Sequence, residues 1–470
     1  MENRDFIIKD ADTLALACEG RVVKKGTVPF SGKLSTDSRN LYPGSFFAAI
    51  KGENFDGHDF VLKALEQNIS GVIIEDSRVG IADSINTNVI SVENTVKALG
   101  KAANFKRKRS GIKIFGITGS VGKTSTREIL KSVLAQKKKV HGPVKNFNNH
   151  IGVPLTILDI NSSHECAVIE MGMSGKGEIE YLSKIAEPDF AIITKLAPAH
   201  MEFFNDISEI AKEKASISKG MKKDSFVIIN EEDTVLEKYI DNMNILKFGF
   251  SKDSDLFISD LELGTSYSKA LFSINIPEKK ESFRVNLSIP GKTAVLNAAG
   301  AALCAFVSGE ETGDIARGIS MYKGTEGRFF KIHVPEKNIY IIDDTYNANP
   351  ESLKAAAMDF AAVKKDSRGF AVIGDMLELG KNAEKYHFEA GEALGELDLD
   401  GVFAYGDFAD SLLEGAKNKA GEKTILFRGT HEQISEEILR IIKPGDYILV
   451  KGSRGSRMET VIENLINKTE

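Results

Sequence analysis

The sequence is poor in the residues and patterns that mark specialised classes of protein. Cysteine is scarce, and the three residues Cys18, Cys166 and Cys304 lie far apart among apolar neighbours. Isolated thiols of this kind are typical of buried, unpaired cysteines in a reducing compartment, and they exclude a small scaffold held together by disulfides. The sequence has no internal repeat, heptad pattern or low-complexity segment, which excludes solenoids, coiled coils and disordered arrays.

Long apolar runs and an excess of positive charge are also missing. No stretch reaches the roughly 18 uninterrupted apolar residues of a membrane-spanning helix, and the first residues, M-E-N-R-D-F, contain no apolar signal core. The net charge of −6 gives the chain no general attraction for nucleic acid or for an anionic membrane. We therefore expect a cytoplasmic protein without membrane insertion or a nucleic-acid partner, in which any phosphate binding is local.

The length and apolar content indicate several globular domains. A chain of 470 residues divides into about three domains of ordinary size, and 42% apolar residues can fill a core in each. Strand-like and helical runs alternate along the chain, which predicts the α/β class. We expect a small α/β domain, then a doubly wound domain, then a Rossmann-like α/β domain. Their predicted bounds are residues 1–92, 93–321 and 322–470.

The central segment contains a phosphate-binding loop, which reads F-G-I-T-G-S-V-G-K-T-S-T from Phe115 to Thr126. An apolar strand leads into Gly119 and Gly122, and a helix-compatible run begins at Lys123. Glycine lets backbone N–H groups close around phosphate oxygens, the lysine reaches the outer phosphates, and the hydroxyl of Thr124 can ligate Mg²⁺. An ordinary strand-to-helix turn gives no reason for a lysine at a helix start, where it opposes the helix dipole. ATP and Mg²⁺ are therefore the expected ligands.

The loop departs from the strict motif at one position, because Ile117 stands where that motif has glycine. The resulting form, T-G-x-x-G-K-T, resembles the loop of two families, the Mur ligases and the folylpolyglutamate synthases. The loop alone leaves both families open. In either case we expect ATP contacts from Thr118, Gly119, Ser120, Gly122, Lys123, Thr124 and Ser125.

Two stretches of the first segment favour one of these families. They are S-T-D-S-R from Ser35 to Arg39 and G-S-F-F-A-A-I-K-G-E-N-F-D-G-H-D-F from Gly44 to Phe60. Alone, the first stretch is either a turn with capping residues or an arginine that holds a diphosphate beside two hydroxyls. Together the two stretches resemble the uridine-nucleotide-binding domain of the Mur ligases, and the resemblance continues along nearly the whole chain. It implies that Ser38 and Arg39 bind the substrate.

Within the Mur ligase family, the resemblance is to the members that complete the peptidoglycan precursor stem. It implies that the chain is an ATP-dependent peptide ligase with two substrates, UDP-N-acetylmuramoyl-tripeptide and D-alanyl-D-alanine. A carboxylate is a poor electrophile, so ATP must activate it, and we expect an acyl phosphate and ADP to form before the amine attacks. We further expect a monomer.

Two side chains after buried strands are candidate metal ligands. Glu170 ends the apolar run in Ala167–Gly172, where it can cap a turn or, beside a phosphate loop, bind Mg²⁺. His200 follows the strand Phe190–Thr194; a lone histidine is commonly structural, but the family motif T-N-x-G-x-A-H implies a ligand of a second metal. Lys195 stands where that motif has asparagine.

A lysine on a predicted helix is the last catalytic candidate. The apolar spacing from Ile207 to Lys219 is helical and places Lys214 near the apolar stripe. Such a lysine is commonly solvated or snorkels past the core, whereas the resemblance implies a carbamate that acts as an anionic metal ligand. The predicted catalytic residues are Lys123, Glu170, His200 and Lys214, and the predicted metal ligands are Thr124, Glu170, His200 and Lys214.

The resemblance also implies contacts from four further stretches. In N-F-N-N-H, the residues Asn148 and Asn149 are turn formers by themselves and substrate contacts by resemblance. The small-residue helix after Gly291 places Asn297 against the adenine, and the third domain reaches the nucleotide with Arg328. Near the ribose and base, the resemblance places Asp344, Tyr346 and Asn347.

One motif and two rival functions stay open. The motif V-K-G-S-R-G-S-R resembles one of the family's C-terminal motifs, but no chemistry is assigned to it, and surface charges are the alternative interpretation of its Lys451 and Arg454. A folylpolyglutamate synthase-like ligase shares the shortened loop but does not account for the two N-terminal stretches. A nucleotide-dependent switch has no need of His200 and Lys214.

Overall fold

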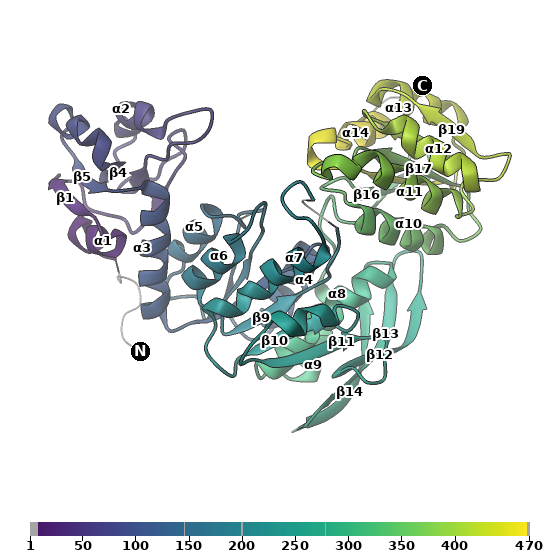
Figure 1. The fold of residues 1–470 in the computed structure, drawn as a ribbon, viewed down its shortest axis with the longest axis horizontal. Helices are drawn as coiled ribbons and strands as arrows, with labels where there is room; N and C mark the ends of the chain where they lie inside the picture. Colours follow the sequence, from purple (N-terminus) through teal and green to yellow (C-terminus); the bar gives the residue numbers. More distant parts are fainter. Residues whose placement is uncertain (1–7, 145, 199–200, 278, 468–470) are drawn as a thin grey trace.

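The computed structural model contains three α/β domains, each built on its own sheet (Figure 1). It describes residues 8–144, 146–198, 201–277 and 279–467. In Figure 1 the N-terminal and C-terminal domains lie on opposite sides of the picture, and each adjoins the central domain. The three-domain α/β class is confirmed. Each sheet lies within one predicted segment, while the borders after residues 92 and 321 stay predictions.

The N-terminal domain has a five-stranded sheet in the order β1-β5-β4-β3-β2, parallel except for β1. Buried apolar side chains from β4 and β5 form its core. A long helix, α3 (Thr95–Ser110), packs against α1 of this domain and against α5 and α6 of the next, and so joins the two. The other elements are α1 (Ala11–Cys18), β1 (Arg21–Lys24), β2 (Leu34–Ser35), β3 (Phe46–Ala48), η2 (Gly57–Phe60), α2 (Val61–Leu65), β4 (Gly71–Glu75), η3 (Asp76–Ser84) and β5 (Asn88–Val92).

The central domain has a nine-stranded sheet in the order β14-β13-β12-β11-β10-β9-β6-β8-β7, parallel from β7 to β12 and antiparallel beyond. Its strands β6, β8 and β9 are nearly continuous apolar runs because helices cover both faces of the parallel part. The elements are β6 (Lys113–Thr118), α4 (Lys123–Leu134), β7 (Val140–His141), α5 (Gly152–Leu158), β8 (Cys166–Glu170), α6 (Glu178–Ala186), β9 (Phe190–Ile193), α7 (Ile207–Ala215), η4 (Ser216–Gly220), β10 (Phe226–Asn230), η5 (Thr234–Tyr239), β11 (Asn244–Gly249), β12 (Leu256–Leu263), β13 (Ser268–Ile276), β14 (Lys279–Leu287), α8 (Lys292–Val307) and α9 (Thr312–Met321).

The C-terminal domain has a six-stranded sheet in the order β15-β16-β20-β17-β18-β19, parallel except for β15. Its first helix begins at Pro350, and the preceding Asn349 forms a capping box with Ser352, as the polar loop before the proline predicts. The elements are β15 (Phe330–Val334), β16 (Ile339–Asp344), α10 (Pro350–Lys364), β17 (Gly369–Gly374), η6 (Gly380–Asn382), α11 (Ala383–Gly395), β18 (Gly401–Tyr405), α12 (Ala409–Lys419), β19 (Ile425–Arg428), α13 (His431–Ile441), β20 (Tyr447–Lys451), η7 (Arg454–Ser456) and α14 (Glu459–Asn467).

The three cysteines are free and buried, which confirms their predicted state. Burial raises the pKa of the Cys18 thiol to about 12 and that of Cys166 to about 11, so both are unreactive thiols at neutral pH. Across the described ranges, none of the helices combines the length and the apolar character needed to cross a bilayer.

Candidate functional site

A cavity of about 310 Å³ lies between the central and C-terminal domains. Its central-domain walls come from the start of α4, the end of β8 and the first turns of α8. Its other walls come from α10 and the ends of β16 and β20. A doubly wound sheet keeps its ligands beyond the carboxyl ends of its strands, which is where this cavity lies. It brings together these predicted residues: Ser120, Gly122, Lys123, Thr124, Ser125, Asn148, Asn149, Glu170, Asn297, Arg328, Asp344, Tyr346 and Asn347.

The phosphate loop requires glycine at two positions. Gly119 has a φ of +143°, and a Cβ added there would lie 2.0 Å from the hydroxyl oxygen of Thr194. Gly122 has a φ of +88°, and its Cβ would lie 2.2 Å from Oδ1 of Asn297. Both positions combine a left-handed backbone with a neighbour that leaves no room for a side chain. Asn297 therefore reaches the loop itself from helix α8.

Two residues of the phosphate loop, Thr118 and Ser120, anchor it to neighbouring segments of the central domain. Thr118 is buried, and its hydroxyl donates to the carbonyl of Met171 at 2.9 Å. Behind the loop, the backbone N–H of Ser120 donates to the carbonyl of Lys195 at 2.7 Å. The side chain of Lys195 forms an ion pair with Glu232 at 2.5 Å. Lys195, which stands where the family motif has asparagine, therefore holds the loop through its backbone carbonyl, while its ammonium pairs with Glu232.

Lys123 lies at the start of α4, with its ammonium folded back onto the loop. Its Nζ donates to the carbonyl of Gly119 at 2.8 Å. Burial lowers the pKa of Lys123, the neighbouring Arg328 lowers it further, and Glu170 raises it. An amine held beside backbone N–H groups at a helix N-terminus is placed to meet a phosphate anion.

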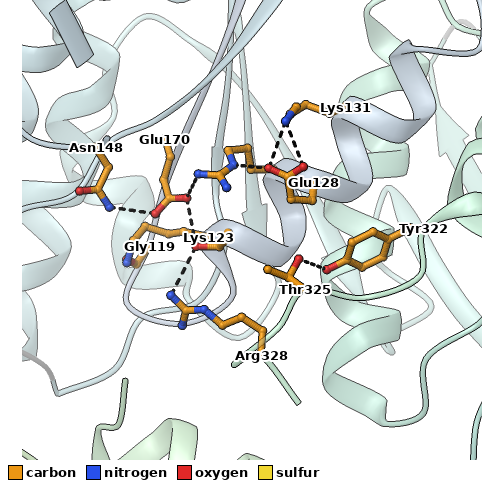
Figure 2. Close-up of polar contacts among 11 residues, drawn as sticks. Gly119, Lys123, Glu128, Lys131, Asn148, Glu170, Tyr322, Thr325 and Arg328 are labelled. Atoms are coloured by element: carbon orange, nitrogen blue, oxygen red, sulfur yellow. Dashed lines mark hydrogen bonds and ion pairs between the residues drawn. The ribbon is translucent and has the colours of Figure 1, made fainter. Parts of the chain in front are cut away.

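Glu170 is the centre of a buried polar cluster, drawn in Figure 2. One of its oxygens accepts a hydrogen bond from the hydroxyl of Thr124 at 3.1 Å and pairs with the guanidinium of Arg127 at 2.9 Å. The other accepts from the side-chain amide of Asn148 at 2.9 Å. The residue is 2% exposed. These partners are side chains, so the carboxylate does not act as the simple turn cap that local sequence allows.

The oxygens of Thr124 and Glu170 fit a magnesium ion that shares its coordination with phosphate and water. Mg²⁺ prefers oxygen ligands and keeps several waters, so it needs only one or two protein groups. Among the described residues, no group of three or more His, Cys, Asp or Glu side chains gathers into a larger metal site. The small donor set in the cavity therefore suits Mg²⁺ bound together with a nucleotide.

Arg328 brings the C-terminal domain to the phosphate loop. Its guanidinium stacks on the ring of Tyr346 at 3.9 Å. Nη2 of Arg328 lies 3.4 Å from the hydroxyl oxygen of Thr124, a contact that Figure 2 marks with a dashed line. Its Nε is buried and has no hydrogen-bond partner in the described part of the chain. A buried donor without an acceptor costs free energy, and a phosphate oxygen in the cavity would satisfy it.

Three family models match consecutive parts of this chain. They are described as "Mur ligase family, catalytic domain" over residues 33–107, "Mur ligase middle domain" over 117–305 and "Mur ligase, glutamate ligase domain" over 327–454. A relative from Bacillus subtilis (strain 168), named UDP-N-acetylmuramoyl-tripeptide--D-alanyl-D-alanine ligase, is 36% identical over 92% of this chain and 93% of its own. The chain belongs to the Mur ligase family.

Solved structures of relatives match this Mur ligase across all three domains. A crystal structure of MurF from Acinetobacter baumannii has a TM-score of 0.87 and 30% identity, and the match covers 98% of this chain and 99% of that one. MurF from Thermotoga maritima, solved in complex with ADP, has a TM-score of 0.79 and 31% identity and covers 92% and 97%. The predicted family is therefore confirmed, and the similarity extends over nearly the whole chain and not only over the phosphate loop.

One interpretation of the sequence is wrong, and it concerns Lys451, which lies in the C-terminal wall of the cavity of this Mur ligase. Lys451 is not a surface charge: it is 2% exposed and forms an ion pair with Asp344 at 2.6 Å. Arg454, from the same motif, is exposed and pairs with Glu459. One signal in the sequence separates the two basic residues: Lys451 directly ends an apolar run, Tyr447–Lys451, which is typical of a buried strand.

Two predicted asparagines have local partners as well as a place in the cavity wall. The side-chain oxygen of Asn149 accepts hydrogen bonds from the backbone N–H groups of Ile151 and Gly152, at 3.1 and 2.9 Å. It therefore organises the start of α5, as the turn-forming alternative predicts. Asn297 accepts a hydrogen bond from Thr126 at 3.4 Å. Both asparagines still line the cavity.

Other predicted residues of this Mur ligase lie outside the cavity or outside the described residues. Arg39 is exposed and makes a two-pronged ion pair with Asp37, with both N–O distances at 2.8 Å. The hydrogen bonds of this pair lower the pKa of Asp37 to about 2. Ser38 lies beside them. Lys214 lies on α7 and does not line the cavity, and His200 falls outside the described residues.

Lys214 is a buried lysine with an unusual environment. It is 2% exposed, and among the described residues its amine has no hydrogen-bond or ion-pair partner. Burial lowers the pKa of Lys214 well below its usual value, and the nearby Lys123 ammonium lowers it further. The amine is therefore held toward its neutral form. This excludes the alternative that it is an ordinary solvated helix residue.

Proposed function

We propose that this chain joins D-alanyl-D-alanine to UDP-N-acetylmuramoyl-tripeptide in peptidoglycan precursor synthesis, with ATP split to ADP and phosphate. The Bacillus subtilis relative bears these substrates in its name and is similar over nearly the whole length. The observation that carries the proposal is the cavity, where Lys123 and Glu170 of one domain meet Arg328 of another. Such a cavity suits a reaction in which two domains close on one nucleotide.

The reaction follows from the need to activate a carboxylate. An oxygen of the tripeptide carboxylate attacks the γ-phosphorus, the bond to the bridging oxygen of ADP breaks, and an acyl phosphate forms. The dipeptide amine then attacks the acyl carbon, and phosphate leaves as the amide forms. No protein nucleophile is needed. The protein positions the reactants, and closure over them excludes water from the acyl phosphate.

The side chains in the cavity neutralise charge during phosphoryl transfer. Lys123 would leave the Gly119 carbonyl for the outer phosphates, and Arg328 would satisfy its buried Nε with a phosphate oxygen. Bound Mg²⁺ supplies Lewis-acid stabilisation of the phosphate oxygens. Thr124 and Glu170 would hold one ion. His200 and a carbamate on Lys214 would hold a second.

The remaining predicted residues take substrate-facing parts in this proposal. We assign the uridine nucleotide to Ser38 and Arg39, because the exposed Arg39 guanidinium can exchange Asp37 for a diphosphate. The other contacts are Asn148 and Asn149 for the acceptor, and Asn297, Asp344, Tyr346 and Asn347 for the nucleoside. The buried, free thiols support a reducing, cytoplasmic location. We propose that the enzyme works there as a monomer.

The substrate assignment predicts when ADP is released. Release should require both UDP-N-acetylmuramoyl-tripeptide and D-alanyl-D-alanine, because closure of the domains needs every substrate. The measurement is ADP formation by purified protein with each substrate alone, with both, and with pteroyl and plain amino-acid acceptors. Faster release with a pteroyl substrate would support a folylpolyglutamate synthase-like activity. Equal release without an amine acceptor would support a nucleotide switch.

The position of Arg328 predicts its contribution to nucleotide binding. Charge-assisted hydrogen bonds contribute about 1.5–3 kcal/mol, so Arg328→Ala should raise the KM for ATP about 10- to 100-fold. The KM values for the two peptide substrates should change little. Arg284→Ala is the matched control, because Arg284 is an exposed arginine on β14 that pairs with Asp260 and does not line the cavity. An unchanged KM for ATP in Arg328→Ala would contradict the role.

A further inference from the structure

Lys451 is a buried lysine in the wall of the nucleotide cavity, and the proposed reaction gives it no part. It is the last residue of β20, in register with Asp344, the last residue of β16. The two side chains therefore leave neighbouring strands at the same edge of the C-terminal sheet, where a parallel sheet keeps its ligands. Lys451 belongs to the V-K-G-S-R-G-S-R motif, whose chemistry the sequence does not assign.

The ammonium of Lys451 joins two parts of the nucleotide-facing loop. It donates to Oδ2 of Asp344 at 2.6 Å and to the carbonyl of Asn347 at 2.9 Å. The hydroxyl of Ser453, two residues later, donates to the carbonyl of Ala348 at 3.3 Å. The start of the motif thus holds the loop that follows β16 at two adjacent points.

Asp344, the partner of Lys451, also contacts the backbone next to Arg328. The other carboxylate oxygen of Asp344 accepts a hydrogen bond from the backbone N–H of Phe329 at 3.1 Å. Phe329 directly follows Arg328, whose guanidinium stacks on Tyr346. Lys451, Asp344 and the backbone at 328–329 therefore form one continuous set of contacts along the C-terminal wall.

Stability alone does not account for this ion pair. Burying a lysine and a carboxylate costs several kcal/mol in lost hydration, and a buried pair is commonly no more stable than apolar residues of the same volume. Here the paired groups also hold neighbouring backbone, the carbonyl of Asn347 and the N–H of Phe329. A buried charge pair that holds a loop at a ligand cavity is best explained by the geometry that it imposes.

We propose that Lys451 is a positioning residue for the nucleotide. It compensates the charge of the partly buried Asp344 carboxylate and fixes the 344–347 and 327–329 segments in the arrangement that receives the nucleoside and phosphates. Lys451 acts through Asp344 and the backbone rather than by touching the phosphates. The inference rests on the proposed function only in taking this cavity as the nucleotide site.

The test measures ADP binding directly, by titration calorimetry of the full-length protein without peptide substrates. Lys451→Met should weaken ADP binding by about tenfold or more, because the loss leaves Asp344 unpaired and the loop free to move. Lys451→Arg, which keeps the charge, should recover part of the affinity. Arg454→Met, a change of the exposed basic residue of the same motif, should bind ADP within about twofold of the parent protein.

A double variant separates positioning from a direct contact and from loss of folding. If Lys451 acts mainly through Asp344, adding Lys451→Met to Asp344→Asn should weaken ADP binding by much less than Lys451→Met weakens it in the parent protein, because only the contact with the Asn347 carbonyl is left to lose. The double variant should also have a higher Tm than Lys451→Met, since it contains no uncompensated carboxylate. Additive losses in the double variant, or unchanged ADP binding in Lys451→Met, would overturn the proposal. Normal ADP binding by the parent protein with no activity on the peptide substrates would overturn the proposed function alone.

Discussion

Replacing Lys123 with alanine is expected to abolish ADP formation, lowering the turnover rate by several powers of ten. The ammonium is the charged donor at the start of α4, already within the loop and 2.8 Å from the Gly119 carbonyl. Without it, charge that develops on the transferred phosphoryl group is uncompensated in a partly dry site. A coupled assay for ADP with saturating substrates measures the effect.

The control for this prediction is a lysine close in sequence but outside the cavity. Lys137, just beyond α4, is half exposed and pairs with Glu311 and Asp314. Lys137→Ala should keep near-normal turnover, and both variants should keep the parent Tm within a few degrees. Near-normal turnover in Lys123→Ala would remove the phosphate loop from the mechanism.

Replacing Lys214 with alanine is expected to have the second large effect, a collapse of activity that short carboxylic acids partly restore. The proposed carbamate forms when the neutral amine attacks CO₂: a C–N bond forms and one proton is released. Burial and Lys123 already hold the amine toward its neutral form. Carbamylation also places a negative charge near the Lys123 ammonium, which attracts it. A small carboxylate can occupy the anion position that the alanine variant vacates.

Two measurements check the Lys214 prediction. ADP formation by Lys214→Ala should rise with added acetate or formate, whereas Lys212→Ala, an exposed lysine on the same helix, should be fully active without them. Carbon-13 NMR of the protein in labelled bicarbonate should show a carbamate signal that Lys214→Ala lacks. A fully active Lys214→Ala variant, or no difference in that signal, would contradict the carbamate.

Short-range patterns explain why much of the site was predictable. The spacing of glycine, lysine and threonine from 119 to 124 follows from the backbone shape that a phosphate needs, and the required glycines have left-handed φ angles. Apolar runs that end in a carboxylate identify buried parallel strands, as at Glu170. The start of helix α10 was predictable because proline suits the first position of a helix and the preceding Asn349 caps it.

Partners that lie far apart in the chain explain what sequence reasoning missed. Arg127 lies on α4, and its pairing with Glu170 depends on how this helix packs over β8. Lys451 and Arg454 belong to one motif, yet the first is buried against Asp344 and the second is exposed. The apolar run before Lys451 predicts that it ends a buried strand, but its partner Asp344 follows only from the register of β16 with β20.

The sequence by itself determined the α/β class, the phosphate loop and the family, because each depends on residues close together or on similarity along the whole chain. Tertiary structure alone decided which charges from distant parts of the chain meet. Arg328 and Thr124 are 204 positions apart, and they approach because the C-terminal domain adjoins the central domain at the phosphate-loop cavity. A buried ion pair forms only where packing removes water from both partners, and no local pattern reports that removal.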